Sequence, residues 1–232
     1  VGDDVIVTSF DLGMNTNGAF SEYISVPSHW VVPLPENLSL KEAATIGTAG
    51  LTAAIGVDKL LKNGQKKGNT ILVTGSTGVV GSFSVKLLHH LGFKVAALSS
   101  KADKKEFLYS IGADTVILKD DFVVDAKRPL LKPLYDGAID VVGGVLLENI
   151  LKQIKHSGSV AICGLVGSPK LDTTVFPFIL RGINLLGIDS AELENTQRFA
   201  LWNKLADEWK IDLGAIVHEH TLQEVPSLVQ TM

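Results

Sequence analysis

The stretch TILVTGSTGVVG at residues 70–81 decides which fold this chain adopts. Its first five residues form a continuous β-forming run, typical of a strand that is buried on both faces. Gly75, Gly78 and Gly81 follow at the spacing G-x-x-G-x-x-G, and apolar residues then recur at helical spacing until Gly92. Glycines at these places permit a tight turn, let backbone amides approach a pyrophosphate, and allow the helix to pack closely. The stretch predicts a dinucleotide-binding turn, with a purely structural glycine turn as the alternative.

Two other nucleotide-binding patterns share glycine-rich turns and are disfavoured by the neighbouring residues. The P-loop of nucleoside triphosphatases requires Lys and then Ser or Thr after its last glycine, whereas Ser82 follows Gly81 here. Short-chain dehydrogenases carry a Tyr-x-x-x-Lys acid/base pair, which this chain lacks. The residues four positions after Tyr23, Tyr109 and Tyr135 are Pro27, Ala113 and Ile139.

Short β-forming runs and helical segments alternate after this stretch. Strands are predicted over residues 70–74, 94–98, 115–118, 138–142, 159–162 and 183–188. Helices are predicted over residues 80–91, 103–111, 145–155 and 195–209. Such alternation indicates an α/β fold with a Rossmann-type, doubly wound parallel sheet that carries helices on both faces.

The residues before the predicted sheet show a different sequence pattern. Short β-forming runs at 5–7, 23–26 and 30–32 are separated by turn residues, which predicts a small antiparallel unit. Ser39 then precedes Glu42 by three positions, a capping box that opens an apolar helical run. We therefore expect a domain boundary near residues 35–39.

Composition excludes several classes of protein. The 232 residues are 46% hydrophobic and 20% charged, with 21 basic and 25 acidic side chains and a formal net charge of −4, so no basic surface for nucleic acid is expected. The longest uncharged stretch, residues 68–85, is broken by glycines and polar residues, which makes it a poor membrane helix. One cysteine cannot form an intrachain disulfide, which favours a reducing, cytoplasmic location. No signal peptide is visible, and we expect both ends to be cut from a longer chain.

The end of the second predicted strand indicates the cofactor. NAD-selective folds place an acidic residue there, on the ribose 2′-hydroxyl. Here the strand leads into Ser99, Ser100 and Lys101, whose hydroxyls and ammonium group suit a 2′-phosphate. Lys119, after the third strand, can add a second positive charge. The pattern favours NADPH, with an ordinary polar loop and a solvated lysine as the alternatives.

Several sequence blocks resemble the medium-chain dehydrogenase/reductase superfamily. They are GAFSEY at 18–23, IGTAGLTA at 46–53, TGSTGVVG at 74–81, AIDVVG at 138–143 and CGLVG at 163–167. The block FPFILRGINLLGIDS at 176–190 resembles the zinc-free quinone oxidoreductase branch of the YhdH/YhfP type, which includes acryloyl-CoA reductases.

The resemblance implies a domain plan. A GroES-like, β-rich catalytic domain would end within residues 1–38, an NADP-binding Rossmann domain would span 39–210, and residues 211–232 would return toward the catalytic domain. About the first third of such a protein would precede this sequence. The missing part would include the tyrosine that lies beside the nicotinamide in this branch, so we name no catalytic residue.

The resemblance also implies site residues. The phosphate loop maps onto Thr77, Gly78, Val79 and Val80, and the 2′-phosphate contacts map onto Ser99, Ser100 and Lys101. The half of the cofactor distant from the adenine would be lined by Leu165, Ile179 and Ser190, with Thr48 facing the pocket. The loop at residues 14–17 lacks the aromatic residue expected before its glycine, which leaves the shape of the substrate pocket open.

Other reactive side chains are interpreted as structural. Asp140 is more simply a structural residue than an acid catalyst, and Cys163 is most simply a small core residue. We expect His218 and His220 on a strand and His89 and His90 at a helix end, without zinc-site partners, and therefore predict no metal site. Trp202 and Trp209 are expected to pack the core from a single helix.

The leading hypothesis is an NADPH-dependent reductase of small molecules, which transfers hydride to an α,β-unsaturated carbonyl or a quinone. The alternative is an NADPH-binding redox sensor or structural protein that has lost turnover, because a fold does not fix a function. An apolar edge strand at 183–188 further predicts a homodimer.

Overall fold

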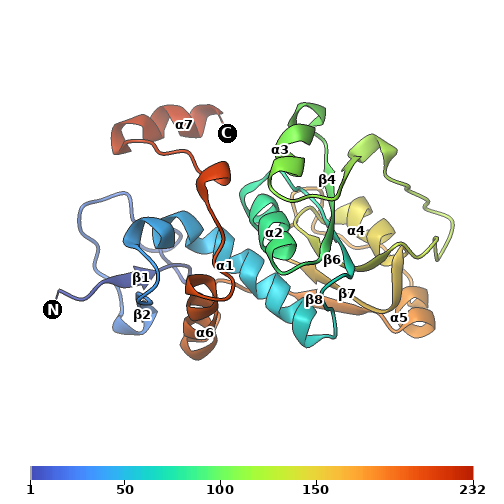
Figure 1. Ribbon diagram of the computed structural model, residues 1–232, viewed down its shortest axis with the longest axis horizontal. Coiled ribbons are helices and arrows are strands. Elements are labelled where there is room, and N and C mark those ends of the chain that lie inside the picture. Colours follow the sequence, from blue (N-terminus) through green and yellow to red (C-terminus); the bar gives the residue numbers. More distant parts are fainter. Residues whose placement is uncertain (1, 232) are drawn as a thin grey trace.

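A computed structural model describes residues 2–231, apart from the side chain of Thr231; Val1 and Met232, the outer ends of the first and last predicted segments, lie outside the described residues. A six-stranded parallel sheet with the order β5-β4-β3-β6-β7-β8 forms its centre (Figure 1). The strands are β3 (Thr70–Val73), β4 (Lys94–Ser99), β5 (Thr115–Leu118), β6 (Tyr135–Asp140), β7 (Ile154–Ile162) and β8 (Asn184–Gly187). The chain winds outward from β3 to one edge and then from β6 to the other. This order is that of a doubly wound Rossmann sheet, which confirms the predicted fold class.

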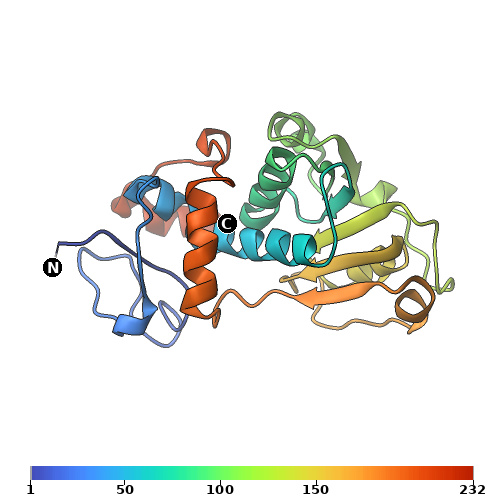
Figure 2. The same cartoon turned by 60° about the horizontal axis from the view of Figure 1, so that its bottom comes forward.

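The helices are α1 (Leu40–Lys62), α2 (Val79–His90), α3 (Lys105–Ser110), α4 (Gly144–Leu151), α5 (Phe176–Arg181), α6 (Asn195–Ala206) and α7 (Val225–Thr231). Short 3-10 turns lie at Ser28–Trp30, Ala102–Lys104, Lys119–Asp121, Gly214–Ile216 and Leu222–Glu224. Both views show α1 running from the N-terminal part of the molecule to the large sheet (Figure 1, Figure 2). In the described part of the chain, no helix combines the length and the apolar character needed to cross a membrane.

The core consists of two apolar layers because successive strand residues point to opposite faces. Ile71 and Val73 of β3 pack in the layer that contains α1, α2 and α6. Leu72, which lies between them, packs in the opposite layer with α4. Both faces of β3 are therefore buried, which explains why its sequence is a continuous run of β-forming residues.

Helix α1 begins at a capping box and is interrupted by a glycine. The Ser39 hydroxyl accepts a hydrogen bond from the Glu42 amide, and the Glu42 carboxylate accepts one from the Ser39 amide. These hydrogen bonds and nearby Lys210 lower the pKa of Glu42 to about 2. Gly47, at φ 48° and ψ −155°, breaks the helix because this conformation is open to glycine and strained for other residues. The predicted helix start is confirmed.

The small N-terminal sheet pairs β1 (Val5–Val7) with β2 (Val31–Pro33) in antiparallel register. The strand predicted over residues 23–26 is wrong. Tyr23 is 90% exposed, and residues 23–26 lie in irregular backbone that no described strand pairs with. A β-forming sequence alone does not make a strand when no neighbouring strand supplies hydrogen bonds.

Several boundaries differ from the prediction: two helices end earlier, β6 lies at Tyr135–Asp140 rather than 138–142, and β7 begins at Ile154 rather than 159. Helix α4 ends at Leu151 rather than 155, because Ile154 already pairs with Tyr135 in the β6–β7 ladder. Residues 217–221, including the two predicted strand histidines, are irregular. Trp209 lies beyond the end of α6 but is buried like Trp202, so the packing role holds although the shared helix does not.

Candidate dinucleotide site

The glycine turn follows β3 and requires two of its glycines for steric reasons. Gly75 has φ 53°, and a Cβ placed there would lie 2.6 Å from the Cγ2 atom of Val141. A Cβ on Gly81 would lie 2.2 Å from the carbonyl oxygen of Gly75. Any larger residue at Gly81 would push α2 away from the turn. The turn is therefore built by close approach of backbone to backbone.

The start of α2 is suited to bind an anion. Gly78 occupies the N-cap position, where it supplies no capping side chain, and no acidic residue lies in the first turn. The amides of Val79, Val80 and Gly81 are the first of the helix, so no preceding helical carbonyl is available to them. They point toward the end where the helix dipole favours negative charge. Thr77 precedes this group and is half-buried.

A buried hydrogen-bond network joins the glycine turn to the loop after β6. The Thr74 hydroxyl donates to Oδ1 of Asp140 at 2.6 Å and accepts from the Val141 amide at 3.0 Å. The other carboxylate oxygen of Asp140 accepts from the Gly143 amide at 2.8 Å. Burial raises the pKa of Asp140, although the Thr74 hydroxyl and the Gly143 amide act in the opposite direction. These contacts support a structural role for Asp140. Thr74 belongs to this site, and its hydrogen-bonding role was missed by the sequence analysis.

The residues predicted to hold a 2′-phosphate lie at one corner of the sheet. Ser99 ends β4 and pairs with Leu118 of β5, which places Lys119 beside Ser100. Ser100, Lys101 and Lys119 are exposed. Ser99 is buried, and its hydroxyl accepts a hydrogen bond from the Lys101 amide at 3.0 Å, which leaves its own proton for another acceptor. Acidic residues lie farther along the two loops, at Asp103, Asp120 and Asp121.

A cavity of about 410 Å³ lies at the carboxyl ends of β7 and β8, where Leu165 lies. It is lined by Ile162, Cys163, Gly164, Leu165, Gly187, Ile188 and Asp189. Cys163 is half-buried, and burial together with the Asp140 charge raises the pKa of its thiol to about 11. The thiol is therefore protonated at neutral pH, which fits a packing residue better than a nucleophile.

Thr48 and Ser190 are brought together through a third residue, Thr52, which the sequence analysis missed. The Thr52 hydroxyl oxygen lies 2.7 Å from the Thr48 carbonyl oxygen and 2.9 Å from the Ser190 hydroxyl oxygen. A hydroxyl has a single proton, so Thr52 donates to the carbonyl and accepts from Ser190. Thr52 lies four residues, or about one helical turn, after Thr48. That spacing in the sequence could have indicated the hydrogen bond between them.

Ile179 does not lie near the carboxyl ends of the strands. It is exposed on α5, which lies at the end of the molecule opposite the small N-terminal sheet (Figure 1, Figure 2). Two residues later, the Arg181 guanidinium donates to the carbonyl oxygens of Lys152 and Ile154, at the start of β7. Ile179 therefore lies toward the amino ends of the strands, and its place in the fold does not support a contact with the cofactor.

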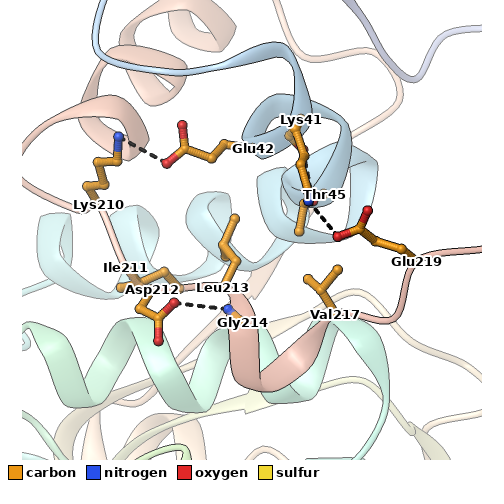
Figure 3. A pocket seen from close by; sticks show the side chains of 10 residues that line it. All are labelled: Lys41, Glu42, Thr45, Lys210, Ile211, Asp212, Leu213, Gly214, Val217 and Glu219. Atoms are coloured by element: carbon orange, nitrogen blue, oxygen red, sulfur yellow. Dashed lines mark hydrogen bonds and ion pairs between the residues drawn. The ribbon is translucent and has the colours of Figure 1, made fainter.

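A separate cavity of about 450 Å³ lies between the start of α1 and residues 210–219 (Figure 3). Two ion pairs flank it, Lys41 with Glu219 and Lys210 with Glu42. Four of its charged side chains form these two ion pairs, Asp212 accepts from the Gly214 amide, and the cavity is not formed by the glycine turn or by the carboxyl ends of the strands. We assign no ligand to it.

Comparisons with known proteins agree with this geometry. Residues 79–206 match a family model described as zinc-binding dehydrogenase. YhfP of Bacillus subtilis, which bears the name of a quinone oxidoreductase, is 43% identical over 99% of this chain and 70% of its own length. The acrylyl-CoA reductase AcuI of Ruegeria pomeroyi is 39% identical over 98% of this chain and 69% of its own.

Solved structures give the same result. The crystal structure of YhfP with NAD bound superposes with a TM-score of 0.96, at 43% identity over 99% of this chain and 71% of that one. YhdH of Escherichia coli with bound NADPH has a TM-score of 0.94, at 38% identity over 100% of this chain and 72% of that one. The chain belongs to the medium-chain dehydrogenase/reductase superfamily of NAD(P)-dependent oxidoreductases. Within that superfamily it is a member of the zinc-free branch of quinone oxidoreductases and acryloyl-CoA reductases.

The description of the family model refers to zinc binding. Among residues 2–231, no three His, Cys, Asp or Glu side chains are grouped so that they could hold a metal ion.

Proposed function

We propose that this protein is an NADPH-dependent reductase that transfers a hydride to an α,β-unsaturated carbonyl compound, such as an acyl-CoA ester, or to a quinone. One observation carries the proposal: the uncapped start of α2 and the basic ends of β4 and β5 lie at the same edge of the sheet. A dinucleotide across this edge would place its pyrophosphate on the backbone amides of α2. Its 2′-phosphate would meet the ammonium groups of Lys101 and Lys119.

The preference for NADPH rests on this chain's own residues. NAD-selective folds place a carboxylate at the end of the second strand, whereas β4 ends at Ser99. The relatives do not agree on the cofactor, since YhfP was solved with NAD and YhdH with NADPH. Ser100, Lys101 and Lys119 present hydrogen-bond donors and positive charge. These groups would stabilise a bound 2′-phosphate, but they would contribute little to binding a free 2′-hydroxyl.

At the other end of the cofactor, bound NADPH would supply the hydride. The chain's residues orient the nicotinamide end and exclude water from it. The cavity at the ends of β7 and β8 is bordered by Leu165 and Ile188, which give it an apolar wall. Thr48 and Ser190 would fix the position of the carboxamide end through the Thr52 hydroxyl. The names of AcuI and YhfP support the two substrate classes, a 2-enoyl thioester and a quinone.

We also propose a division of the chain into three functional parts. Residues 1–38 would belong to the catalytic domain, 39–210 would bind the cofactor, and 211–232 would return toward the catalytic domain. The small sheet formed by β1 and β2 supports the first boundary, since it is separate from the large sheet. The end of α6 at Ala206 supports the second.

Consumption of NADPH by the intact protein tests the proposal. NADPH absorbance is followed after addition of acryloyl-CoA, a 2-alkenal or a quinone, with NADH run in parallel. We expect substrate-dependent loss of absorbance that is faster with NADPH. Binding of NADPH without turnover on any of the three substrates would instead support a redox sensor. Failure to bind either dinucleotide would overturn both interpretations.

A further inference from the structure

Arg198 of α6 is completely buried and joins two distant segments of the chain. Its Nη1 donates to the carbonyl oxygen and the hydroxyl oxygen of Thr8, both at 3.2 Å. Its Cζ lies 4.5 Å from the centre of the Phe10 ring. Its Nη2 lies 3.2 to 3.4 Å from the carbonyl oxygens of Ser190, Ala191 and Leu193, which share its two protons.

A buried guanidinium is costly, so these contacts require an explanation beyond packing. None of these hydrogen bonds goes to a carboxylate; all the acceptors are neutral carbonyl or hydroxyl oxygens. A planar guanidinium with several donors can hold carbonyls from two segments at once in a fixed geometry, which no apolar side chain and no lysine can do. Arg198 therefore acts as a clamp between residues 8–10 and residues 190–193.

The N-terminal segment in this clamp has an unfavourable backbone. Ser9 and Phe10 have φ angles of 71° and 52°, in a region that L-residues rarely adopt. The Phe10 amide donates to the Ala191 carbonyl at 3.1 Å, and the Phe10 ring stacks on Trp30 at 5.3 Å. These contacts, together with Arg198, hold the turn at residues 8–10 against the loop that follows β8.

The clamped loop leads directly to the proposed nicotinamide end of the site. Ser190, whose carbonyl is bound by Arg198, donates through its hydroxyl to Thr52, and Thr52 donates to the Thr48 carbonyl. Asp189, the preceding residue, borders the cavity at the ends of β7 and β8 and accepts from the Ala191 amide at 2.9 Å. The position of residues 189–190 is thus tied to the guanidinium.

We propose that Arg198 is a positioning residue: it fixes residues 189–193 against the turn at 8–10 and so sets where Ser190 and Thr48 stand at the nicotinamide end of the site. The inference rests on the proposed function, because it concerns the same site. It also implies that the N-terminal segment and the loop after β8 are coupled through the Arg198 side chain, together with the hydrogen bond from the Phe10 amide to the Ala191 carbonyl. Arg198 itself touches neither the proposed cofactor contacts at α2 nor those at β4.

A double-mutant cycle tests the inference. The dissociation constant of NADPH is measured for wild type, Arg198→Lys, Ser190→Ala and the double variant. Arg198→Lys keeps the charge and loses most of the carbonyl contacts, so we expect NADPH to bind about tenfold more weakly. Ser190→Ala alone should weaken binding about threefold. If Arg198 acts through Ser190, the double variant should bind no more weakly than Arg198→Lys alone.

Arg181→Lys is the matched control. Arg181 also binds several backbone carbonyls, those of Leu131, Lys152 and Ile154, but it does so at the amino end of the sheet. We expect its replacement to lower the melting temperature without changing NADPH affinity. If Arg198→Lys does not fold, Phe10→Leu replaces it in the cycle, since it removes the ring that covers the guanidinium.

The outcomes separate the two proposals. Independent, multiplicative losses in the double variant overturn the positioning role, as does an unchanged NADPH affinity in Arg198→Lys. The KM values of a positioning variant should rise for NADPH while the phosphate-loop end is unaffected, so affinity for 2′,5′-ADP should stay at the wild-type value. A wild-type protein that binds no NADPH contradicts the proposed function itself, and the inference then fails with it.

Discussion

The Thr74 hydroxyl lies 2.6 Å from the Asp140 carboxylate, in the interior and at the point where the sheet reverses its winding direction. This contact joins the glycine turn after β3 to the loop after β6, between which a dinucleotide would lie. Neither loop can move independently while it holds. The glycine turn is thus fixed by a side chain from the neighbouring strand as well as by its own glycines.

Removal of the carboxylate should therefore destabilise the fold. In Asp140→Ala the Thr74 hydroxyl and the Gly143 amide lose their buried acceptor, and each unpaired group costs about 1 to 3 kcal/mol. We expect the free energy of unfolding in urea to fall by about 2 to 4 kcal/mol. Asp140→Asn keeps one acceptor oxygen and should lose less. Equal losses for the two variants would argue against the hydrogen bonds as the cause.

The difference in stability between Asp140→Asn and the wild type should depend on pH. Burial raises the pKa of Asp140 above its usual value of 3.8, so the carboxylate is harder to ionise in the folded state than in the unfolded state. Its contribution to stability is complete below pH 3.8 and is lost as the pH rises through the folded-state pKa. Asn has no such titration. The stability of Asp140→Asn relative to wild type should therefore improve as the pH rises above about 4, measured by urea unfolding at each pH.

Glu42 should show the opposite sign. Its folded-state pKa of about 2 lies below the usual 4.5, so its contribution is present above pH 4.5 and is lost as the pH falls toward 2. Glu42→Ala removes half of the capping box at the start of α1 and should cost about 1 kcal/mol at neutral pH. Unfolding curves of variant and wild type should converge near pH 2. Glu36→Ala, an exposed glutamate outside the helix, is the control and should show no such convergence.

Much of this fold could be predicted from the sequence because local and tertiary preferences agree. β3, β4 and β6 lie inside the sheet, and their apolar runs reflect burial on both faces. The glycine turn was predictable because a Cβ at Gly81 or Gly75 would lie only 2.2 or 2.6 Å from a neighbouring atom, which leaves no alternative to glycine. The capping box at Ser39 was equally local.

The remainder depends on contacts between residues far apart in sequence. Ile154 joins a strand because Tyr135 is there to pair with it, which no local pattern reports. Arg198 binds Thr8 across 190 positions, so its role could not be inferred from a helix sequence. Ile179 was assigned by resemblance alone, and the direction of α5 carries it away from the carboxyl ends of the strands.

Cofactor selection should depend on Lys101. A charge-assisted bond to a phosphate contributes about 1.5 to 3 kcal/mol, and exposure of this side chain reduces that value, so Lys101→Ala should weaken NADPH binding about tenfold. NADH affinity should barely change, since a free 2′-hydroxyl gains little from the ammonium. Lys94→Ala, an exposed lysine at the other end of the same strand, is the matched control. Fluorescence titrations with both dinucleotides decide the matter: equal losses for NADPH and NADH, or a wild type that prefers NADH, would contradict the assignment.

Self-association through β8 is the last expected property. β8 forms the outer edge of the sheet, and the neighbouring α5 exposes Ile179 and Leu180, at 68% and 53%. An unpaired edge beside an apolar surface favours pairing with a second copy around a twofold axis. We expect light scattering at micromolar concentration to return twice the mass of the chain.

A charge placed on this surface should dissociate the pair without unfolding either copy. Leu180→Glu introduces a carboxylate that would be buried against its symmetry mate. The free-energy cost of burying this charge is larger than an ion pair at the surface could offset. We expect the variant to elute as a monomer with an unchanged circular dichroism spectrum. Val123→Glu replaces another apolar side chain, 58% exposed, that follows β5 at the opposite edge of the sheet, and it should leave the dimer intact. A monomeric wild type, or dissociation of both variants alike, would show that β8 is not the interface.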